Sequence, residues 1–308
     1  MAFCAFTLII IFAGVQNGIE RVSKIMMPIL IVLSVIIAVY SVTRPGALAG
    51  VKYFLVPNVK NFSWMTVVSA MGQMFYSLSI AMGILITFGS YMKKDTAIED
   101  STRNVEIFDT GIAIMAGLMI IPAVFAFSGG DPDTLQAGPS LMFITIPKVF
   151  QNMGFGTVIG IVFFLLVLFA AVTSSIALTE SAVSTFEDEL GWGRKKATVL
   201  VGVIMLALGS LSSLGYGPLA GIKIIGMQFL DLFDFLTNSV MMPIAALLTS
   251  LFVSRVVGID KIEEEIIHGE SAFRRKKVFV VMIKYLCPVF AIIILLSSVA
   301  NALGWIKM

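Results

Sequence analysis

The sequence predicts an all-α polytopic membrane protein, and its composition and its long apolar runs are the observations that predict it. Apolar residues make up 58% of the 308 positions and charged residues only 13%, a balance typical of membrane-embedded chains. Apolar runs long enough to cross a bilayer alternate with short charged loops. The runs expected to span the membrane are 16–42, 64–92, 105–127, 156–185, 197–213, 222–253 and 278–300.

Basic residues in alternate loops indicate the orientation. One alternating set of segments holds Arg21, Lys24, Lys93, Lys94, Arg103, Arg194, Lys195, Lys196, Arg255, Lys261, Arg274, Arg275, Lys276 and Lys277. The opposite, smaller set holds Arg44, Lys52, Lys60, Lys148, Lys223 and Lys307. Because cytoplasmic loops are enriched in Lys and Arg, we expect the first set in the cytoplasm and the C-terminus outside it. With the basic residues in loops of a membrane protein, no nucleic-acid partner is expected.

The first apolar run, Ala2 to Gly14, is too short to span a bilayer. A secretory signal is one interpretation, but no Lys or Arg precedes the run and another span follows at once. A re-entrant segment is a second. We expect instead a helix cut through its middle, so that 1–14 is a truncated transmembrane helix and the chain is a fragment.

The span from Trp64 to Tyr91 contains several small and polar residues. They are Gly72, Gln73, Ser77, Ser79 and Gly83. The chain is expected to unwind around 77–83, which frees backbone carbonyls and amides that a ligand or cavity water must satisfy. The alternative is that small residues let neighbouring helices pack closely.

The stretch from Phe169 to Leu190 places hydroxyls and carboxylates where a lipid-spanning helix is expected to be apolar. It holds Thr173, Ser174 and Glu180. A carboxylate near the bilayer centre costs about 2.5–3.5 kcal/mol, so such a residue indicates function. We expect a second interruption here and a cation bound by oxygen atoms. The alternatives are hydroxyls bonded to the carbonyl four residues back, and a packing hydrogen bond from Glu180 to a neighbouring helix.

Three more acids fall near or within spans. Asp109 lies about one turn inside its span, and its alternative is an interfacial residue at the start of a helix. Asp231 and Asp234 are expected to line an outer vestibule, with snorkelling towards the surface as the alternative. Cys4 and Cys287 both lie in apolar runs, so no disulfide is expected.

The order of motifs resembles the neurotransmitter:sodium symporter family in its bacterial amino-acid branch. The matching segments are GIERVSKIMMPIL at 18–30, AMGQMFYSLSIAMG at 70–83, ITFGSYMKKD at 86–95, AGPSLMFITIPKVF at 137–150, FAAVTSSIAL at 169–178 and FEDEL at 186–190. The resemblance implies a partial inverted-repeat (LeuT-type) transporter fold of about seven full transmembrane helices. In the family's order, 1–14 is the end of helix 4 and 15–308 is a single domain of helices 5 to 11. The second repeat then covers roughly 64–254.

The resemblance also implies roles for individual residues. Substrate-contacting positions are Tyr76, Ser77, Ser79, Ile80, Met82, Ser174 and Leu178. Sodium-binding positions are Ser77 and Asp109 at one site, and Ala170, Thr173 and Ser174 at the other. Gln73 and Asp234 match the outer gate, and Tyr91 and Asp188 match the inner gate. Glu180, two turns from Thr173, is expected along the inner sodium exit path, where it accepts a proton on the return step.

Two positions depart from the family's pattern. Many members have an asparagine at Asp109, and chloride-dependent relatives have a serine where this chain has Ala113. An ionised aspartate neutralises a bound cation directly, so chloride-independent transport is expected. Met82 occupies a position that is often aromatic. With Ile80 and Leu178 it forms an apolar subsite, which favours a hydrophobic or aromatic amino acid.

The segments corresponding to helices 1 to 3 are missing, and helix 1 in this family supplies half of both sodium sites. The 308-residue chain alone is therefore expected neither to bind nor to transport. The intact protein is expected to be a sodium-coupled symporter of a neutral amino acid in the cell membrane.

Rival interpretations are an ion channel and an inactive truncated or pseudogene product. An enzyme is not expected, because the single histidine, His268, lies in a charged loop and no HExxH or GxSxG motif occurs. The sequence does not indicate an oligomeric state.

Overall fold

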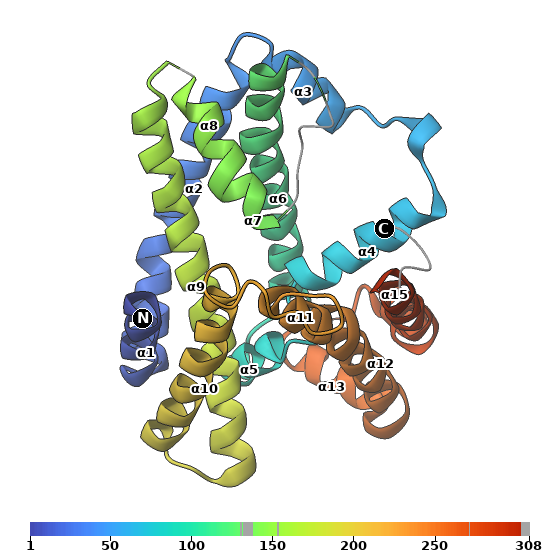
Figure 1. The fold of residues 1–308 in the computed structure, drawn as a ribbon. Coiled ribbons are helices and arrows are strands. Elements are labelled where there is room, and N and C mark those ends of the chain that lie inside the picture. The colour runs from blue at the N-terminus through green and yellow to red at the C-terminus, as the bar shows by residue number, and fades with distance from the viewer. Residues whose placement is uncertain (130, 132–137, 153, 271, 303–308) are drawn as a thin grey trace. The chain divides into compact units, whose positions relative to one another are not determined.

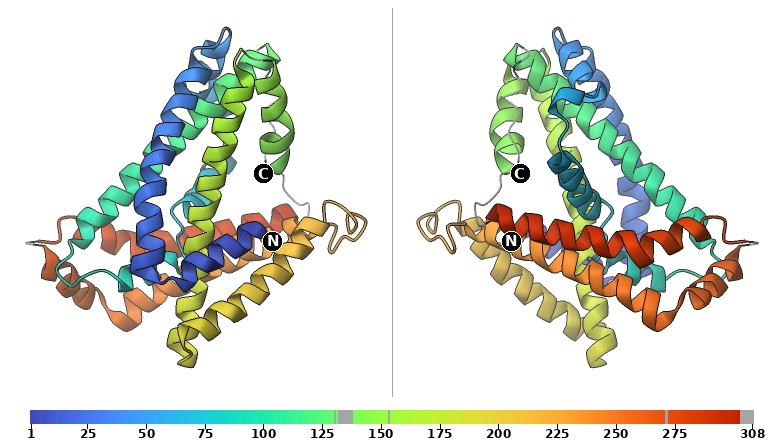
Figure 2. Two further views of the ribbon diagram at one scale, coloured as in Figure 1. Left: turned by 90° about the vertical axis from the view of Figure 1, so that its left-hand side faces the viewer. Right: turned by 90° about the vertical axis from the view of Figure 1, so that its right-hand side faces the viewer.

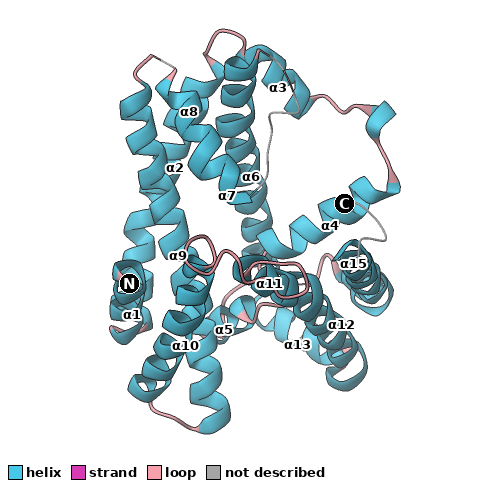
Figure 3. Ribbon diagram, viewed as in Figure 1, coloured by secondary structure: helices cyan, strands magenta, loops and turns pink. Residues whose placement is uncertain are grey.

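The computed structural model describes residues 1–129, 131, 138–152, 154–270 and 272–302. These residues are helical and joined by loops, with one isolated β-bridge between Ile224 and Met227 (Figure 3). The last residues, including Lys307, lie outside the described part of the chain.

Most of the predicted spans are helices in the structure, because their apolar runs are long enough. Six helical stretches are long and apolar enough to cross a bilayer, by length and composition. They are Val15–Val42, Ile98–Ser128, Gly156–Leu190, Arg194–Leu214, Phe229–Val257 and Lys276–Ala302 (Figure 1). The first run forms only the short helix α1 (Ala2–Phe12), as its length predicted. The prediction of a multi-pass membrane protein is thus confirmed.

The remaining predicted span, 64–92, is divided into two helices. α4 (Trp64–Ser77) and α5 (Ile84–Ser90) replace one continuous segment. Another difference concerns the predicted span 222–253, since residues 222–228 are not helical and the helix begins only at Phe229. The apolar run alone placed that start too early, because the tight turn that closes the bridge between Ile224 and Met227 interrupts it.

Several spans contain π-helical turns, which divide them into labelled pieces. The first span is a π turn (Val15–Glu20) followed by α2 (Arg21–Val42), and the fifth is α11 (Phe229–Asp234), a π turn (Phe235–Met241), α12 (Met242–Phe252) and a π turn (Val253–Val257). The last is α14 (Lys276–Val281), a π turn (Met282–Leu286) and α15 (Cys287–Ala302). The uninterrupted spans are α6 (Ile98–Ser128), α9 (Gly156–Leu190) and α10 (Arg194–Leu214).

Shorter helices lie between the spans. They are α3 (Ala47–Leu55), a 3-10 turn (Val59–Asn61), α7 (Gly138–Ser140), a π turn (Leu141–Thr145), α8 (Ile146–Gln151) and α13 (Ile259–Gly269). α13 carries charged residues on its exposed face, and its Ile266 side chain is buried.

The chain divides into two compact units. The first consists of Met1–Phe12, Ser63–Glu106 and Ala177–Met308, and the second of Ala13–Phe62 and Ile107–Ile176. In the first unit, a core forms where α4 meets α12 and α15, and Figure 2 shows α12 and α15 running beside each other (orange to red). That core consists of Phe75, Met242, Ala246, Ala291 and Ile294.

The second unit has a core of its own. It consists of Ile37, Ala38, Met119, Ala123, Val124, Ile146, Val149, Phe150, Ile159, Phe163 and Leu166. These residues join α2, α6, α8 and the first half of α9. The Ser41 hydroxyl donates a 2.7 Å hydrogen bond to the Met119 carbonyl, which ties α2 to α6 inside this core. This unit carries Asp109, Ala170, Thr173 and Ser174.

Candidate functional site

The interrupted helix is the most informative feature of the first unit. α4 ends at Ser77 and α5 begins at Ile84, so the predicted unwinding around 77–83 is confirmed. Positive φ angles at Ser79 (54°), Ala81 (64°) and Gly83 (77°) turn the chain out of the right-handed helix. The regular ladder resumes with the 2.9 Å bond from the Thr87 amide to the Gly83 carbonyl.

The residues predicted to contact substrate surround this break. Tyr76 and Ser77 form the last turn of α4, and Ser79, Ile80 and Met82 lie in the connecting turn. Ile80 and Met82 pack against the core of the first unit, which fixes the path of the turn. Tyr76 is 53% exposed, so its ring is available to a ligand or to another segment. The break therefore brings together the substrate positions that belong to this unit, apart from Leu178 on α9.

A cavity of about 420 Å³ lies beside α4, between it and the helices of the fifth and last spans. It is lined by Gly72, Gln73, Phe75, Tyr76, Asp234, Asn238, Ser239, Met242, Pro243, Ile294 and Ser298. Gln73 and Asp234, the two residues matched to the outer gate, thus face one cavity. The Asn238 amide donates a hydrogen bond to the Asp234 carboxylate one turn away. The sequence did not single out Asn238.

The stretch 169–190 does not contain the interruption predicted for it. α9 runs without a break from Gly156 to Leu190, so that prediction is wrong. The Thr173 hydroxyl donates to the carbonyls of Phe169 (3.1 Å) and Ala170 (3.0 Å), and bonding of this kind needs no unwinding. The Thr173 side chain thus adopts the alternative weighed above. The helix ends at Leu190, and the next residue, Gly191, has a φ of 60°, the left-handed conformation common after helix C-termini.

The other predicted ion-binding residues have different surroundings. Ala170 is partly buried on α9, whereas Ser174 and Leu178 are exposed on the same helix. Asp109 lies on α6 and is partly buried. Ser77 belongs to the first unit and Asp109, Ala170, Thr173 and Ser174 to the second.

Glu180 forms a buried ion pair that sequence reasoning missed. Its side chain is fully buried. Both of its carboxylate oxygens accept hydrogen bonds from the Arg194 guanidinium, at 3.0 Å and 2.6 Å. The Tyr91 hydroxyl donates to the same carboxylate at 2.7 Å, so α5, α9 and α10 meet at this point. Arg194 also contacts Glu187 at 3.4 Å and donates to the Ile11 carbonyl of α1 at 3.0 Å.

Arg194 was assigned to a cytoplasmic loop, but it is the first residue of α10 and its side chain is only 24% exposed. The hairpin between α9 and α10 folds its guanidinium back onto Glu180, and sequence separation alone does not show this. The alternative interpretation of Glu180, a hydrogen bond to a neighbouring helix, therefore describes its surroundings. Of the predicted inner-gate residues, Tyr91 joins this cluster, whereas Asp188 is exposed near the end of α9.

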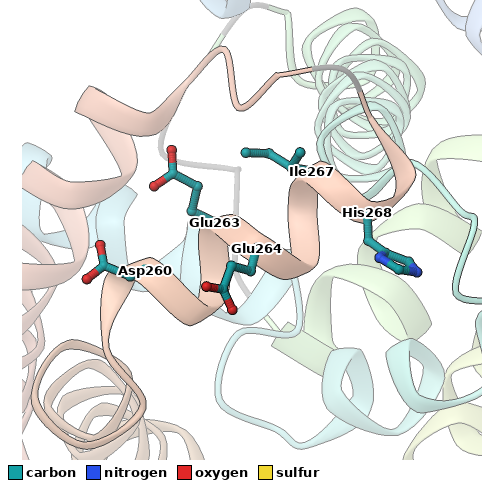
Figure 4. A pocket seen from close by; sticks show the side chains of 5 residues that line it. All are labelled: Asp260, Glu263, Glu264, Ile267 and His268. Atoms are coloured by element: carbon teal, nitrogen blue, oxygen red, sulfur yellow. The ribbon is translucent and has the colours of Figure 1, made fainter.

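Acidic side chains gather on the exposed face of α13. Figure 4 shows Asp260, Glu263, Glu264, Ile267 and His268 along this helix, and they line a shallow surface hollow. Among the described residues, no group of three or more His, Cys, Asp or Glu side chains is arranged to hold a metal ion. The Glu263 carboxylate is paired with Lys276, which links α13 to α14.

Comparisons with known proteins agree with the fold. The model of the sodium:neurotransmitter symporter family matches residues 1–305. An uncharacterized sodium-dependent transporter of Bacillus subtilis, YhdH, is 34% identical over 97% of this chain and 66% of its own length. A relative from Methanocaldococcus jannaschii, MJ1319, is 30% identical over 86% of this chain and 54% of its own length. The chain thus spans between about half and two thirds of the length of these relatives.

A solved structure gives the same result in three dimensions. The crystal structure of MhsT in complex with L-phenylalanine is similar at a TM-score of 0.83 and 34% identity, over 96% of this chain and 66% of the other. The partial inverted-repeat (LeuT-type) fold expected from the sequence is confirmed by this similarity. By its family match and its fold, the chain belongs to the sodium:neurotransmitter symporter family.

Proposed function

We propose that the protein containing this chain carries out sodium-coupled symport of a neutral, apolar amino acid by alternating access. The observation that carries the proposal is the break between α4 and α5. An unwound segment in a spanning helix exposes backbone amides and carbonyls, which suit the two charged ends of an amino acid. In lipid such groups require a partner, and a bound substrate supplies one.

The side chains around the break favour an apolar substrate. Ile80 and Met82 lie in the turn and Tyr76 precedes it, so the subsite offers aliphatic and aromatic surface. Leu178 on α9 is proposed to complete this apolar subsite. Phenylalanine, the ligand of the similar MhsT structure, has the size and polarity that such a subsite accepts.

Two sodium ions are proposed to bind beside the substrate. Ser77 and Asp109 contribute to one site, and Ala170, Thr173 and Ser174 to the other. Hydroxyl, carboxylate and carbonyl oxygens are the ligands that a hard cation prefers. The Thr173 hydroxyl donates its proton to the helix carbonyls, so its oxygen lone pairs remain able to accept a cation.

The energy available from two sodium ions is sufficient for accumulation. Each ion moving inward down a 100 mV potential releases about 2.3 kcal/mol, and a tenfold concentration ratio adds about 1.4 kcal/mol. Two ions therefore supply roughly 7 kcal/mol. This energy is enough to hold the concentration of a neutral substrate about 10⁵-fold higher inside than outside. We propose that the loops richer in Lys and Arg lie in the cytoplasm, as the charge distribution indicates, and that the C-terminus lies on the outer side.

The test is uptake by the purified protein in proteoliposomes, with every segment that its gene encodes. A panel of radiolabelled amino acids is offered with an inward sodium gradient, with potassium in place of sodium, and with gluconate in place of chloride. We expect saturable uptake of hydrophobic amino acids that requires sodium and persists without chloride. Uptake equal in sodium and potassium would contradict the proposal, and single-file ion flux without any amino acid would favour a channel.

A further inference from the structure

Ser181 is a buried serine on α9 whose hydroxyl faces the end of the break rather than its own helix. It is 6% exposed. Its Oγ donates to the Met82 carbonyl at 3.4 Å and accepts from the Thr87 hydroxyl at 3.5 Å. All of these residues belong to the first unit. One side chain of α9 therefore contacts both the last part of the unwound turn and the first helical turn of α5.

Gly83, between those two contacts, approaches Ser181 more closely than any side chain would permit. A Cβ added at Gly83 would lie 2.7 Å from the Ser181 Oγ, and it would meet no other atom within 4 Å. Ordinary carbon–oxygen contacts do not become that short, so a side chain at position 83 would require the Ser181 hydroxyl to shift away from the Met82 carbonyl. Gly83 also has a φ of 77°, where glycine has no steric cost.

The hydrogen bonds to Ser181 satisfy polar groups at the end of the unwound turn. A carbonyl that has left the helical ladder needs a partner when it is shielded from water. The Ser181 hydroxyl supplies one for the Met82 carbonyl. Both bonds are long, so their energies are modest, and the close packing at Gly83 contributes most to the geometry.

We propose that Ser181 is a positioning residue that holds the start of α5 against α9 and thereby fixes Met82 in the substrate subsite. This inference rests on the proposed function, because it assigns Met82 to that subsite. Ser181 itself does not contact substrate. Its effect should therefore appear in the concentration of amino acid that gives half-maximal uptake, KM, and not in the maximal rate.

A double-mutant cycle tests this proposal with Gly83→Ala, Ser181→Ala and the two combined, in the complete reconstituted protein. Ser181→Ala is expected to raise KM about threefold, the size of a weak hydrogen bond, with the maximal rate within about twofold of the original. Gly83→Ala alone is expected to raise KM about tenfold or more. In the Ser181→Ala background it should raise KM several-fold less, because the colliding oxygen is gone while the backbone strain remains.

Thermal unfolding of the same four proteins provides a second readout that needs no transport. Gly83→Ala should lower the Tm more in the original protein than in the Ser181→Ala background. Ser34→Ala is the matched control, since Ser34 is also buried but its hydroxyl donates to the Leu30 carbonyl of its own helix at 2.8 Å. It should leave KM unchanged.

Additive effects of the two substitutions on both KM and Tm would overturn the proposal, as would a rise in KM with Ser34→Ala equal to that with Ser181→Ala. If the original protein shows no sodium-dependent uptake, the proposed function fails. In that case the Tm values of the four proteins alone show whether Ser181 holds α5 against α9. Additive effects of the two substitutions on Tm would then overturn this contact as well.

Discussion

Of two spans that carry polar residues in their central part, one breaks and the other stays continuous. The helix that begins at Trp64 stops at Ser77 and resumes at Ile84, whereas α9 continues through Thr173, Ser174 and Glu180 to Leu190. The difference lies in the backbone. Three residues of the first span adopt positive φ angles, while the hydroxyl of Thr173 bonds to carbonyls of its own helix. Polar side chains alone therefore do not interrupt a helix in lipid.

The two spans also satisfy their polar groups in different ways. In α9 the single buried carboxylate, Glu180, is neutralised by Arg194 and accepts a hydrogen bond from the Tyr91 hydroxyl. In the break, the amides of Leu78, Ser79 and Ile80 bond to carbonyls of α4, and the Met82 carbonyl accepts from the Ser181 hydroxyl. We infer that α9 holds its side chains in place on a continuous helix, whereas the break places an irregular stretch of chain beside the substrate.

Removing the partner of Glu180 should give the largest loss of stability. Arg194→Met leaves a fully buried carboxylate uncompensated and should cost about 3–5 kcal/mol of unfolding free energy. Glu180→Gln should cost less, because Arg194 keeps Glu187 at 3.4 Å. The measurement is denaturant unfolding in a defined detergent. The control is Lys24→Met, which removes an exposed pair with Glu20 and should leave the free energy of unfolding almost unchanged. Equal losses for Arg194→Met and Lys24→Met would show that the buried pair does not hold α9 in place.

Alanine substitutions at two glycines of the interrupted span should have different effects on the free energy of unfolding. Gly83→Ala forces a side chain into a left-handed conformation and against Ser181, and should cost about 1–3 kcal/mol. Gly72→Ala lies inside α4 with open space around it, and should be neutral or stabilise by about 0.5–1 kcal/mol. Thermal unfolding of both variants measures this. Similar effects of the two changes would contradict the left-handed break.

Replacing the acid of α6 should change the ionic requirement for transport. Asp109→Asn removes the negative charge proposed to neutralise sodium in a poorly screened site, and should raise the half-activating sodium concentration about tenfold or create a need for chloride. Sodium titrations of uptake, with and without chloride, measure both. Glu106→Gln, three residues earlier on the same helix and paired with Arg275, is the control and should leave sodium activation unchanged. Unaltered sodium and chloride dependence in Asp109→Asn would exclude the assigned role.

The smallest expected effect concerns the hydroxyl on the unbroken helix. Thr173→Val should raise the half-activating sodium concentration about fivefold, about 1 kcal/mol, because an oxygen ligand is lost. Thr43→Val is closely matched, since the Thr43 hydroxyl also donates to the carbonyls three and four residues back. It should leave sodium activation unchanged. If both variants behave alike, the Thr173 hydroxyl serves the helix alone.

Much of the fold was predictable because hydrophobicity and helix length are local properties. The break was predictable for the same reason, since Gly83 and its serine neighbours lie in one short segment. The pairing of Glu180 with Arg194 was not, because it depends on how the hairpin between α9 and α10 closes. The continuity of α9 was missed because a threonine hydroxyl bonds equally well to a cation or to its own helix, and the sequence does not distinguish the two.

We propose above all that oxygen atoms of Ser77, Asp109, Ala170, Thr173 and Ser174 bind sodium. A structure of the complete protein with sodium and a transported amino acid bound, with thallium as an anomalous substitute for the ion, tests it most directly. The account predicts one ion held by Ser77 and Asp109 and another held by Thr173, Ser174 and the Ala170 carbonyl. Ions bound elsewhere, or these side chains directed into lipid, would contradict it.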